Sequence, residues 1–266
     1  MAEPQDVVSA LIAEGLDLDR LVAGLDESQW ALPTPAEGWS VAHQIAHLAM
    51  VFQMATMSTT APAAFTDFLG GIGPDFNGAV QQGLLPFLAD GPEKLLSRWR
   101  ELRSSAERGL AALEPGTVVP WLVRPIPAAV LAAAGTMELF AHGQDVADAL
   151  GVRRQYTDRL RHVAGFAVLT WDFGYQARGL TPPETEFGYD LTSPSGELWQ
   201  FGPAEAEQRI SGPAVDFCLL VTRRRHREDL AVVATGADAD QWLNLAQAYR
   251  GPAGPGRTPG QFDALG

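Results

Sequence analysis

Cysteine is almost absent from this chain of 266 residues, which contains only Cys218. A single cysteine excludes an intramolecular disulfide framework and a cysteine-rich zinc site. Cys218 lies in the apolar run DFCLLV, a pattern that favours a buried packing residue over a reactive nucleophile. Candidate chemistry therefore rests with other side chains.

Positively charged residues are also scarce. Lysine and arginine total 19 against 32 acidic residues, the formal net charge is −13, and Lys94 is the only lysine. Binding of nucleic acid requires clustered basic residues that neutralise phosphates. The charge balance therefore argues against a nucleic-acid partner.

The sequence also lacks a recognisable targeting segment and a membrane span. The N-terminus MAEPQDVV is acidic and has no basic stretch ahead of an apolar one, unlike a signal peptide. No run approaches the roughly 18 uncharged apolar residues of a transmembrane helix. We therefore expect a cytoplasmic protein with no membrane partner, and the sequence leaves a monomer and a homodimer open.

Helical periodicity is the main pattern that the chain does contain. Apolar residues recur at intervals of three and four through the first two thirds of the sequence. This spacing predicts helices over residues 6–25, 41–57, 92–113, 128–150 and 158–177. Ser40 directly precedes the second of these helices and is its predicted N-cap.

The pattern of apolar and polar residues changes after the two prolines Pro182 and Pro183. Short alternating runs separated by turn residues follow, a series typical of hairpins, together with two helical segments. We therefore predict a mainly α fold, with a four-helix bundle in residues 1–182 and a small α+β domain in residues 183–250. Residues 251–266 are rich in glycine and proline, which predicts a flexible tail.

The stretch TMELFAHGQDVADAL carries the first candidate site. Glu138 and His142 are four residues apart and Asp145 follows three later, so all three share one face of the helix. A carboxylate and an imidazole supply two ligands for a divalent ion. A buried carboxylate needs a metal or a positive partner, and the structural alternative is a hydrogen-bonded pair between Glu138 and His142.

The stretch GWSVAHQIAHL supplies the third ligand. It contains His43 and His47, one turn apart, and His47 is favoured because it lies deeper in its helix. Two histidines and one glutamate, with positions left open, are typical of metal-assisted catalysis. His43 and Asp145 remain candidates for moving a proton or, equally, for purely structural hydrogen bonds.

A long excursion separates the two motifs. Residues 58–91 are broken by proline and glycine, with one short helix predicted over residues 75–85, and contain no lysine or arginine. This composition favours an apolar lid over a pocket rather than a clamp for a phosphate. Trp39 and Phe76 are the aromatic residues that we expect to line that pocket.

Both motifs resemble the DinB-like superfamily, and specifically its mycothiol-dependent maleylpyruvate isomerase branch. The matching pieces are GW-S-V-x3-I-A-H-L, which contains His47, and E-x3-H-G-x-D from Glu138 to Asp145. Their order and separation agree with the family, as does an appended sterol-carrier-like α+β domain. The resemblance covers nearly the whole chain, but the motifs are short, so they imply fold and metal site more strongly than substrate.

The resemblance implies that His47, Glu138 and His142 are metal ligands. Zinc is the expected ion, with nickel or iron as alternatives, and mycothiol is the expected co-substrate. Arginines hold the anionic substrate in the relatives. The corresponding residues here are Arg223, Arg224 and Arg225, which alternatively form a solvated basic patch, and Asn77 stands about where a further arginine is expected.

Three functions remain open at this stage. The first is a metal-dependent isomerase or S-transferase that joins mycothiol to a small electrophilic substrate. The second is a thiol-independent isomerase, cyclase or lyase acting on an apolar carbonyl compound of secondary metabolism. The third is a non-catalytic protein that carries a metal.

Overall fold

The computed structural model describes residues 4–71, 75–114, 116–122 and 124–262, apart from the side chains of residues 4–6, 76 and 77. The chain divides into two compact units, Met1–Arg153 and Arg154–Gly266. Within the described residues, no helix is both long and apolar enough to cross a membrane.

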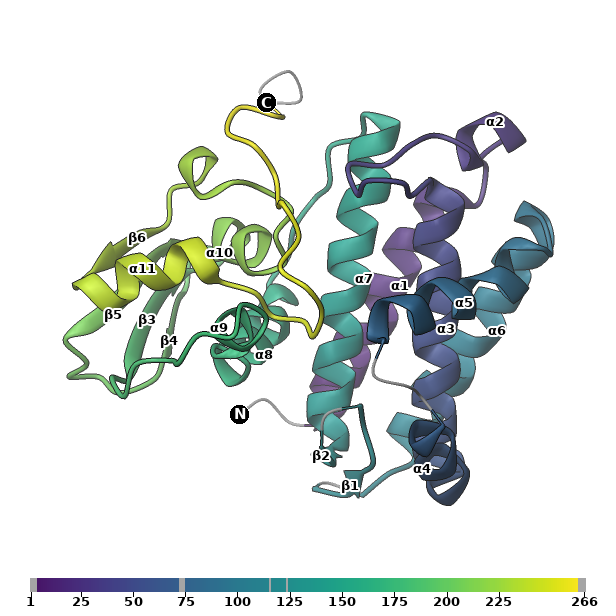
Figure 1. Ribbon diagram of the computed structural model, residues 1–266, viewed down its shortest axis with the longest axis horizontal. Coiled ribbons are helices and arrows are strands. Elements are labelled where there is room, and N and C mark those ends of the chain that lie inside the picture. The colour runs from purple at the N-terminus through teal and green to yellow at the C-terminus, as the bar shows by residue number, and fades with distance from the viewer. Residues whose placement is uncertain (1–3, 72–74, 115, 123, 263–266) are drawn as a thin grey trace. The chain divides into compact units, whose positions relative to one another are not determined.

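The first unit is built around four long helices, whose arrangement can be followed in Figure 1. They are α1 (Pro4–Val22), α3 (Val41–Thr60), α6 (Pro92–Ala111) and α7 (Ala128–Leu150). Helix α3 packs against both α6 and α7, and α1 packs against the same two helices. The predicted four-helix bundle is therefore present, and the short helix α2 (Glu27–Trp30) lies in the connection between α1 and α3.

Local sequence explains where α3 and α7 begin and end. Ser40 has extended backbone angles at the N-cap of α3, and its amide and hydroxyl both contact Nδ1 of His43, so the predicted N-cap position is confirmed. Helix α7 ends at Gly151, whose φ of 64° is left-handed and therefore suits glycine. These two helices carry the candidate site.

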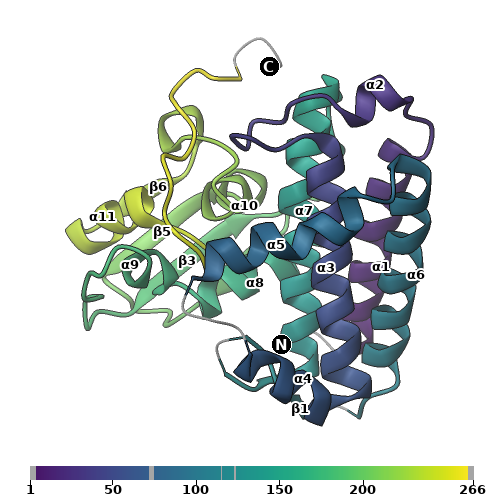
Figure 2. The ribbon, with the colours of Figure 1, turned by 45° about the vertical axis from the view of Figure 1, so that its right-hand side comes forward.

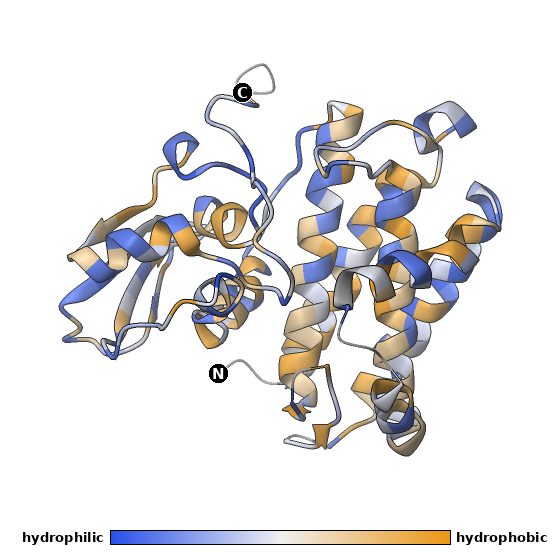
Figure 3. Ribbon diagram, in the orientation of Figure 1, coloured by the Kyte–Doolittle hydropathy of each residue, from blue (hydrophilic) through white to orange (hydrophobic). Residues whose placement is uncertain are grey.

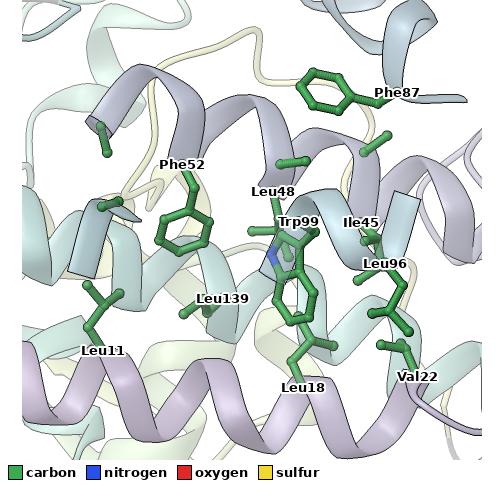
Figure 4. Packing of buried hydrophobic residues seen from close by; sticks show 14 of the residues in the cluster. Leu11, Leu18, Val22, Ile45, Leu48, Phe52, Phe87, Leu96, Trp99 and Leu139 are labelled. Carbon is green, nitrogen blue, oxygen red and sulfur yellow. The ribbon is translucent and has the colours of Figure 1, made fainter. Parts of the chain in front are cut away.

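The core of the bundle lies where the apolar faces of the helices meet. Polar and apolar residues alternate in bands along the bundle helices, as amphipathic packing requires (Figure 3). Figure 4 shows the buried side chains Leu11, Leu18, Val22, Ile45, Leu48, Phe52, Phe87, Leu96, Trp99 and Leu139. Burial of one such leucine or phenylalanine contributes about 1.5–3 kcal/mol to folding.

The excursion between the two motifs contains two helices rather than the single one predicted. They are α4 (Pro62–Gly70) and α5 (Phe76–Leu88), and both pack against α3. Helix α5 crosses α3 in both ribbon views (Figure 2). Gly83 permits this close approach, since a Cβ there would lie 2.5 Å from the sulfur of Met50 on α3.

A short ribbon of two strands precedes α7. Strand β1 (Val118–Val119) pairs antiparallel with β2 (Ile126–Pro127), and β2 leads directly into the helix. Ser58, near the end of α3, donates a hydrogen bond to the carbonyl of Pro120 at 2.6 Å. This bond ties the ribbon to the bundle.

The second unit is built on a four-stranded sheet in the order β4-β3-β5-β6. Its strands are β3 (Phe187–Thr192), β4 (Leu198–Phe201), β5 (Gln208–Pro213) and β6 (Val233–Thr235), and its helices are α8 (Leu160–Leu169), α9 (Phe173–Gln176), α10 (Ala214–Val221), the 3-10 helix η1 (Arg227–Asp229) and α11 (Ala237–Leu245). Strands β3 and β4 form the expected hairpin, but β5 pairs parallel with β3. The predicted α+β character is confirmed, although the pairing is not a simple series of hairpins.

The boundary between the units lies earlier than the sequence predicted. It falls between Arg153 and Arg154 rather than near residue 182, because α8 packs against α10 and β4 and belongs with the sheet. The thiol of Cys218 on α10, which is buried as expected, points at the carbonyl of Leu160 at 3.7 Å. Apolar periodicity identifies a helix but not the layer on which it packs.

The C-terminal tail is more ordered than its composition predicted. Residues 251–262 form no helix or strand, yet the amide of Gly260 donates to Asp229 at 2.8 Å and Arg225 lies 3.7 Å from the ring centre of Phe262. These contacts attach the described part of the tail to the second unit.

Candidate metal centre

His47, Glu138 and His142 converge between α3 and α7. The Oε2 atom of Glu138 lies 3.4 Å from Nε2 of His47 and 3.2 Å from Nε2 of His142. One ligand atom from each of the three residues lies within 4.8 Å of the others, and no other such group of three occurs among the described residues. The structure thus brings together the three residues that the sequence singled out.

Helix geometry explains this convergence. Glu138 and His142 are four residues apart on α7, so their side chains stack on one face of that helix. His47 lies on α3, which packs directly against α7. The rings of His47 and His142 face each other with their centres 4.4 Å apart. Glu138 and His142, one turn apart on α7, therefore form a compact triad with His47 on α3.

The triad is largely shielded from solvent. The side chains of His47, Glu138 and His142 are 15%, 21% and 12% exposed. Burial by itself would raise the pKa of the Glu138 carboxyl, but hydrogen bonds from His142 and His47, with their charges, hold that pKa well below its ordinary value. Glu138 is therefore a carboxylate at neutral pH, ready to hold a cation.

The donor set and its spacing fit a divalent metal. Ligand atoms bonded at about 2.0–2.1 Å to a tetrahedral zinc ion lie about 3.3 Å apart, close to the two separations measured here. Two imidazole nitrogens and one carboxylate oxygen are also the ligands of catalytic zinc sites with an open position. The residues present thus match what such an ion requires.

Gln44 contacts the triad and was missed by the sequence reasoning. Its Oε1 atom lies 2.5 Å from Nδ1 of His142, and its side chain is fully buried. An uncharged glutamine on an apolar helix face, one turn before His47, was the only signal available. Its importance appears only when α7 is seen beside α3.

Trp39 lies against the two histidines of the triad, and its place in a substrate pocket remains a prediction. Its ring is stacked on that of His142, with an interplanar angle of 20° and 6.0 Å between centres, and lies 5.5 Å from His47. The indole thus covers the two histidines with an apolar surface.

The two candidate proton carriers lie outside the group of ligand atoms. His43 is the third residue of α3, where its Nδ1 is 2.9 Å from the hydroxyl of the N-cap residue Ser40, and burial lowers the pKa of its imidazole. Asp145 is almost wholly buried on α7, one turn beyond His142. The structure gives His43 a capping contact and leaves the catalytic role of both residues a prediction.

A family model described as the mycothiol maleylpyruvate isomerase N-terminal domain matches residues 11–147. This span is just over half of the chain and contains all three members of the triad. The chain belongs to the mycothiol maleylpyruvate isomerase family. This membership confirms the resemblance seen in the sequence and identifies the protein as one of a family of enzymes.

Two curated relatives match almost the whole chain. Proteins described as uncharacterized from two strains of Mycobacterium tuberculosis are 44% identical over 257 residues, covering 97% of this chain and 100% of each relative. A shorter match, to a model described as wyosine base formation, covers residues 190–235.

Two crystal structures of a mycothiol-dependent maleylpyruvate isomerase, one of them a variant with a histidine replaced by alanine, share the fold. Their TM-scores are 0.57 and 0.56 at 15% and 14% identity, and the matches cover 87% of this chain and 93% of each structure. The likeness supports the predicted fold class of a helical bundle followed by an α+β domain.

The three arginines expected to hold an anionic substrate lie in the second unit, after α10. Arg223 donates to Gln247 and Gly254, and burial lowers the pKa of its guanidinium. Arg224 is buried and donates to the carbonyl of Thr222, whereas Arg225 is partly buried. The three are therefore not an exposed basic patch.

Two further predicted pocket residues are only partly described. The backbone of Phe76 and Asn77 forms the first turn of α5, but their side chains lie outside the described residues. Their role in a pocket remains a prediction.

Proposed function

We propose that this protein is a divalent-metal-dependent isomerase that uses mycothiol to act on a small electrophilic substrate. The observation that carries the proposal is the convergence of His47, Glu138 and His142 within the region matched by the family model. The crystal structures that share its fold are described as mycothiol-dependent maleylpyruvate isomerase, which supports the same reaction class.

In this proposal His47, Glu138 and His142 hold the metal, which we expect to be zinc. A bound divalent ion supplies a Lewis acid that lowers the pKa of a thiol or polarises a carbonyl. Glu138 contributes the one negative charge of the triad, and the two neutral imidazoles complete it. A single carboxylate leaves the centre with net positive charge, which favours a thiolate.

The surrounding residues position the reactants. Trp39 presents an apolar ring beside both histidines and excludes water from that side. His43 is more accessible than Asp145, and the lowered pKa of its imidazole keeps it neutral near pH 7. We therefore favour His43 as the group that moves a proton.

Thiol addition accounts for isomerisation without a redox partner. The sulfur adds to an activated carbon–carbon double bond, the resulting single bond rotates, and the thiolate leaves again. The thiol is regenerated, so no oxidant or reductant is consumed. Arg223 and Arg225 are less buried than Arg224 and remain the residues of the second unit proposed to bind an anionic group.

The first experiment is elemental analysis of the purified protein together with His47→Ala and Glu138→Gln. We expect about one equivalent of metal in the parent and far less in both variants, with circular dichroism unchanged. Gln53→Met, an exposed position on α3, is the control that keeps the metal. A parent without metal after reconstitution with zinc, nickel or iron would leave the triad as a hydrogen-bonded cluster and overturn the proposal.

A direct assay follows from the family name. Maleylpyruvate is tested as substrate with and without mycothiol, using the metal-loaded protein. Turnover that requires both the thiol and the triad supports the proposal at the level of substrate. Binding of mycothiol without turnover of maleylpyruvate would keep the thiol chemistry and replace the substrate.

A further inference from the structure

Beyond the three ligands, the structure assigns a positioning role to Gln44. We propose that Gln44 keeps a proton of His142 on Nδ1, so that Nε2, whose hydrogen bond to Glu138 a metal would replace, is the nitrogen left for the ion. This inference rests on the proposed metal site, because the tautomer decides which nitrogen of His142 can bind the metal. Two hydrogen bonds lead from Thr34 through Gln44 to His142.

The hydroxyl of Thr34 sets the direction of the hydrogen bonds. It donates its one hydrogen to the carbonyl of Trp39 at 2.9 Å. Towards Gln44, which lies 2.8 Å away, it can therefore only accept. The amide of Gln44 must present its NH₂ group to Thr34, and its oxygen then faces the opposite way.

The oxygen of Gln44 meets Nδ1 of His142 at 2.5 Å. An amide oxygen is only an acceptor, so Nδ1 of His142 carries the proton. In a neutral imidazole the other nitrogen, Nε2, then keeps its lone pair. That nitrogen is the one that lies 3.2 Å from the Glu138 carboxylate, where a cation would join the two.

Burial makes the alternative orientation costly. Gln44 is fully buried, and Thr34 is only 9% exposed. Reversing the amide would set two hydrogen-bond acceptors against each other at Thr34. An unsatisfied buried polar group costs about 1–3 kcal/mol, so the observed orientation dominates.

The two histidine ligands differ in this respect. Nδ1 of His47 is buried without a hydrogen-bond partner among the described residues. Gln44 therefore controls one ring of the triad and not the other. Outer partners of this kind orient ligands, and their removal weakens metal binding by about 10- to 100-fold.

The same turn that anchors Gln44 also carries the aromatic ring of Trp39. The amide and the hydroxyl of Thr34 both donate to the Trp39 carbonyl, and Pro33 bridges to Ser40. Trp39 thus contributes its carbonyl to the hydrogen-bond chain and its ring to the stack on His142. The loop preceding α3 therefore positions His142 in two ways, through the hydrogen bonds of Thr34 and Gln44 and through the ring of Trp39.

The test compares Gln44→Met, Gln44→Glu and Thr34→Val with the parent. Zinc affinity is measured by competition with a chromophoric chelator. We expect Gln44→Met to bind zinc about 10- to 100-fold more weakly, since it keeps the length of the side chain but loses the acceptor. Gln44→Glu, with a proton on the carboxyl oxygen that faces Thr34, keeps both the donor to Thr34 and the acceptor for Nδ1, so it should bind zinc about as tightly as the parent.

Thr34→Val should fall between these two, because Gln44 stays but loses its anchor. Gln53→Met, the same substitution at an exposed site of the same helix, should bind zinc as the parent does. A merely structural role for Gln44 would not produce this order of zinc affinities among the variants. Equal zinc affinity in Gln44→Met and the parent would overturn the inference.

A second readout separates this inference from the proposed function. Long-range nitrogen-15 spectra of the histidine rings report the tautomer in metal-free protein at a pH above the titration range of histidine. We expect Nδ1–H on His142 in the parent and a changed pattern in Gln44→Met. An unchanged pattern overturns the inference even if zinc binds, and absence of zinc binding in the parent overturns the proposed function alone.

Discussion

At the residue scale, Glu138 is the member of the triad on which both histidines depend. A single oxygen of its carboxylate faces Nε2 of His47 and Nε2 of His142. The spacing of Glu138 and His142 in the sequence predicted that they share a helix face, and a buried carboxylate predicted a partner. The role of Gln44 could not be predicted, because it depends on which side chain of α7 the glutamine meets across the bundle.

Replacement of Glu138 should therefore affect the metal more than any outer residue does. Glu138→Gln keeps the shape of the side chain and removes its charge. We expect zinc affinity to fall by more than the roughly 10- to 100-fold loss typical of an outer partner. Chelator competition measures the loss, and a variant that retains the affinity of the parent would exclude Glu138 as a ligand.

His43 provides a prediction about pH. Burial lowers the pKa of its imidazole below the ordinary 6.5, so the unfolded chain takes up a proton at higher pH than the folded chain. Protonation then favours unfolding, and the free energy of unfolding falls as the pH drops through about 6.5. Above about pH 6.5 His43 is neutral in both the folded and the unfolded chain, so it adds no pH dependence to the free energy of unfolding.

His43→Gln should remove this pH dependence and keep the helix cap, because glutamine is a usual partner at this position of a capping box. Urea unfolding at about pH 7.5 and about pH 5.5 measures the effect. The parent should lose more stability between these two pH values than the variant. Equal losses of stability in the parent and the variant would show that the titration of His43 does not contribute to the pH dependence of unfolding.

At the element scale, the pairing of α1 with α7 depends on Gly135. A Cβ at this position would lie 3.0 Å from a methyl group of Leu11, so the two helices approach closely one turn before Glu138. Gly135→Val should lower the free energy of unfolding by about 1–3 kcal/mol through overpacking. Urea denaturation measures the change.

The matched control is Gly24→Val, where a Cβ would meet no atom within 4 Å. Its effect should be much smaller than that of Gly135→Val. Leu11→Ala combined with Gly135→Val should cost less than the sum of the two single substitutions, because the smaller side chain makes room for the valine. Additive effects of the two substitutions would contradict a direct contact.

The elements show where sequence patterns suffice. Helix α7 was predicted with the observed bounds, because its apolar face is long and continuous. Helix α4 was missed because PAAFTDFLG is short and flanked by residues that break helices. The parallel pairing of β3 with β5 was missed because alternation reveals a strand but not its neighbour.

At the scale of the whole molecule, the triad belongs entirely to the first of two compact units. A ligand that binds only the folded state stabilises it, by about 2.7 kcal/mol at a hundredfold excess over the dissociation constant. Zinc should therefore raise the stability of the first unit more than that of the second. Hydrogen exchange should show added protection in α3 and α7 but not in the sheet β3–β6.

An equal gain of protection in both units would contradict this expectation, because it would mean that they unfold together. The boundary itself could not be predicted from the sequence. Residues 160–176 have helical periodicity, as the bundle helices do, and only their packing on the sheet assigns them to the second unit.

The most direct test of the central claim is the absorption spectrum of the cobalt-substituted protein during titration with mycothiol. The account predicts a saturable new near-ultraviolet band, from a thiolate bound at the metal, that is absent in Glu138→Gln. Saturating mycothiol without any spectral change, in a protein that holds one equivalent of cobalt, would contradict the thiol chemistry at this site.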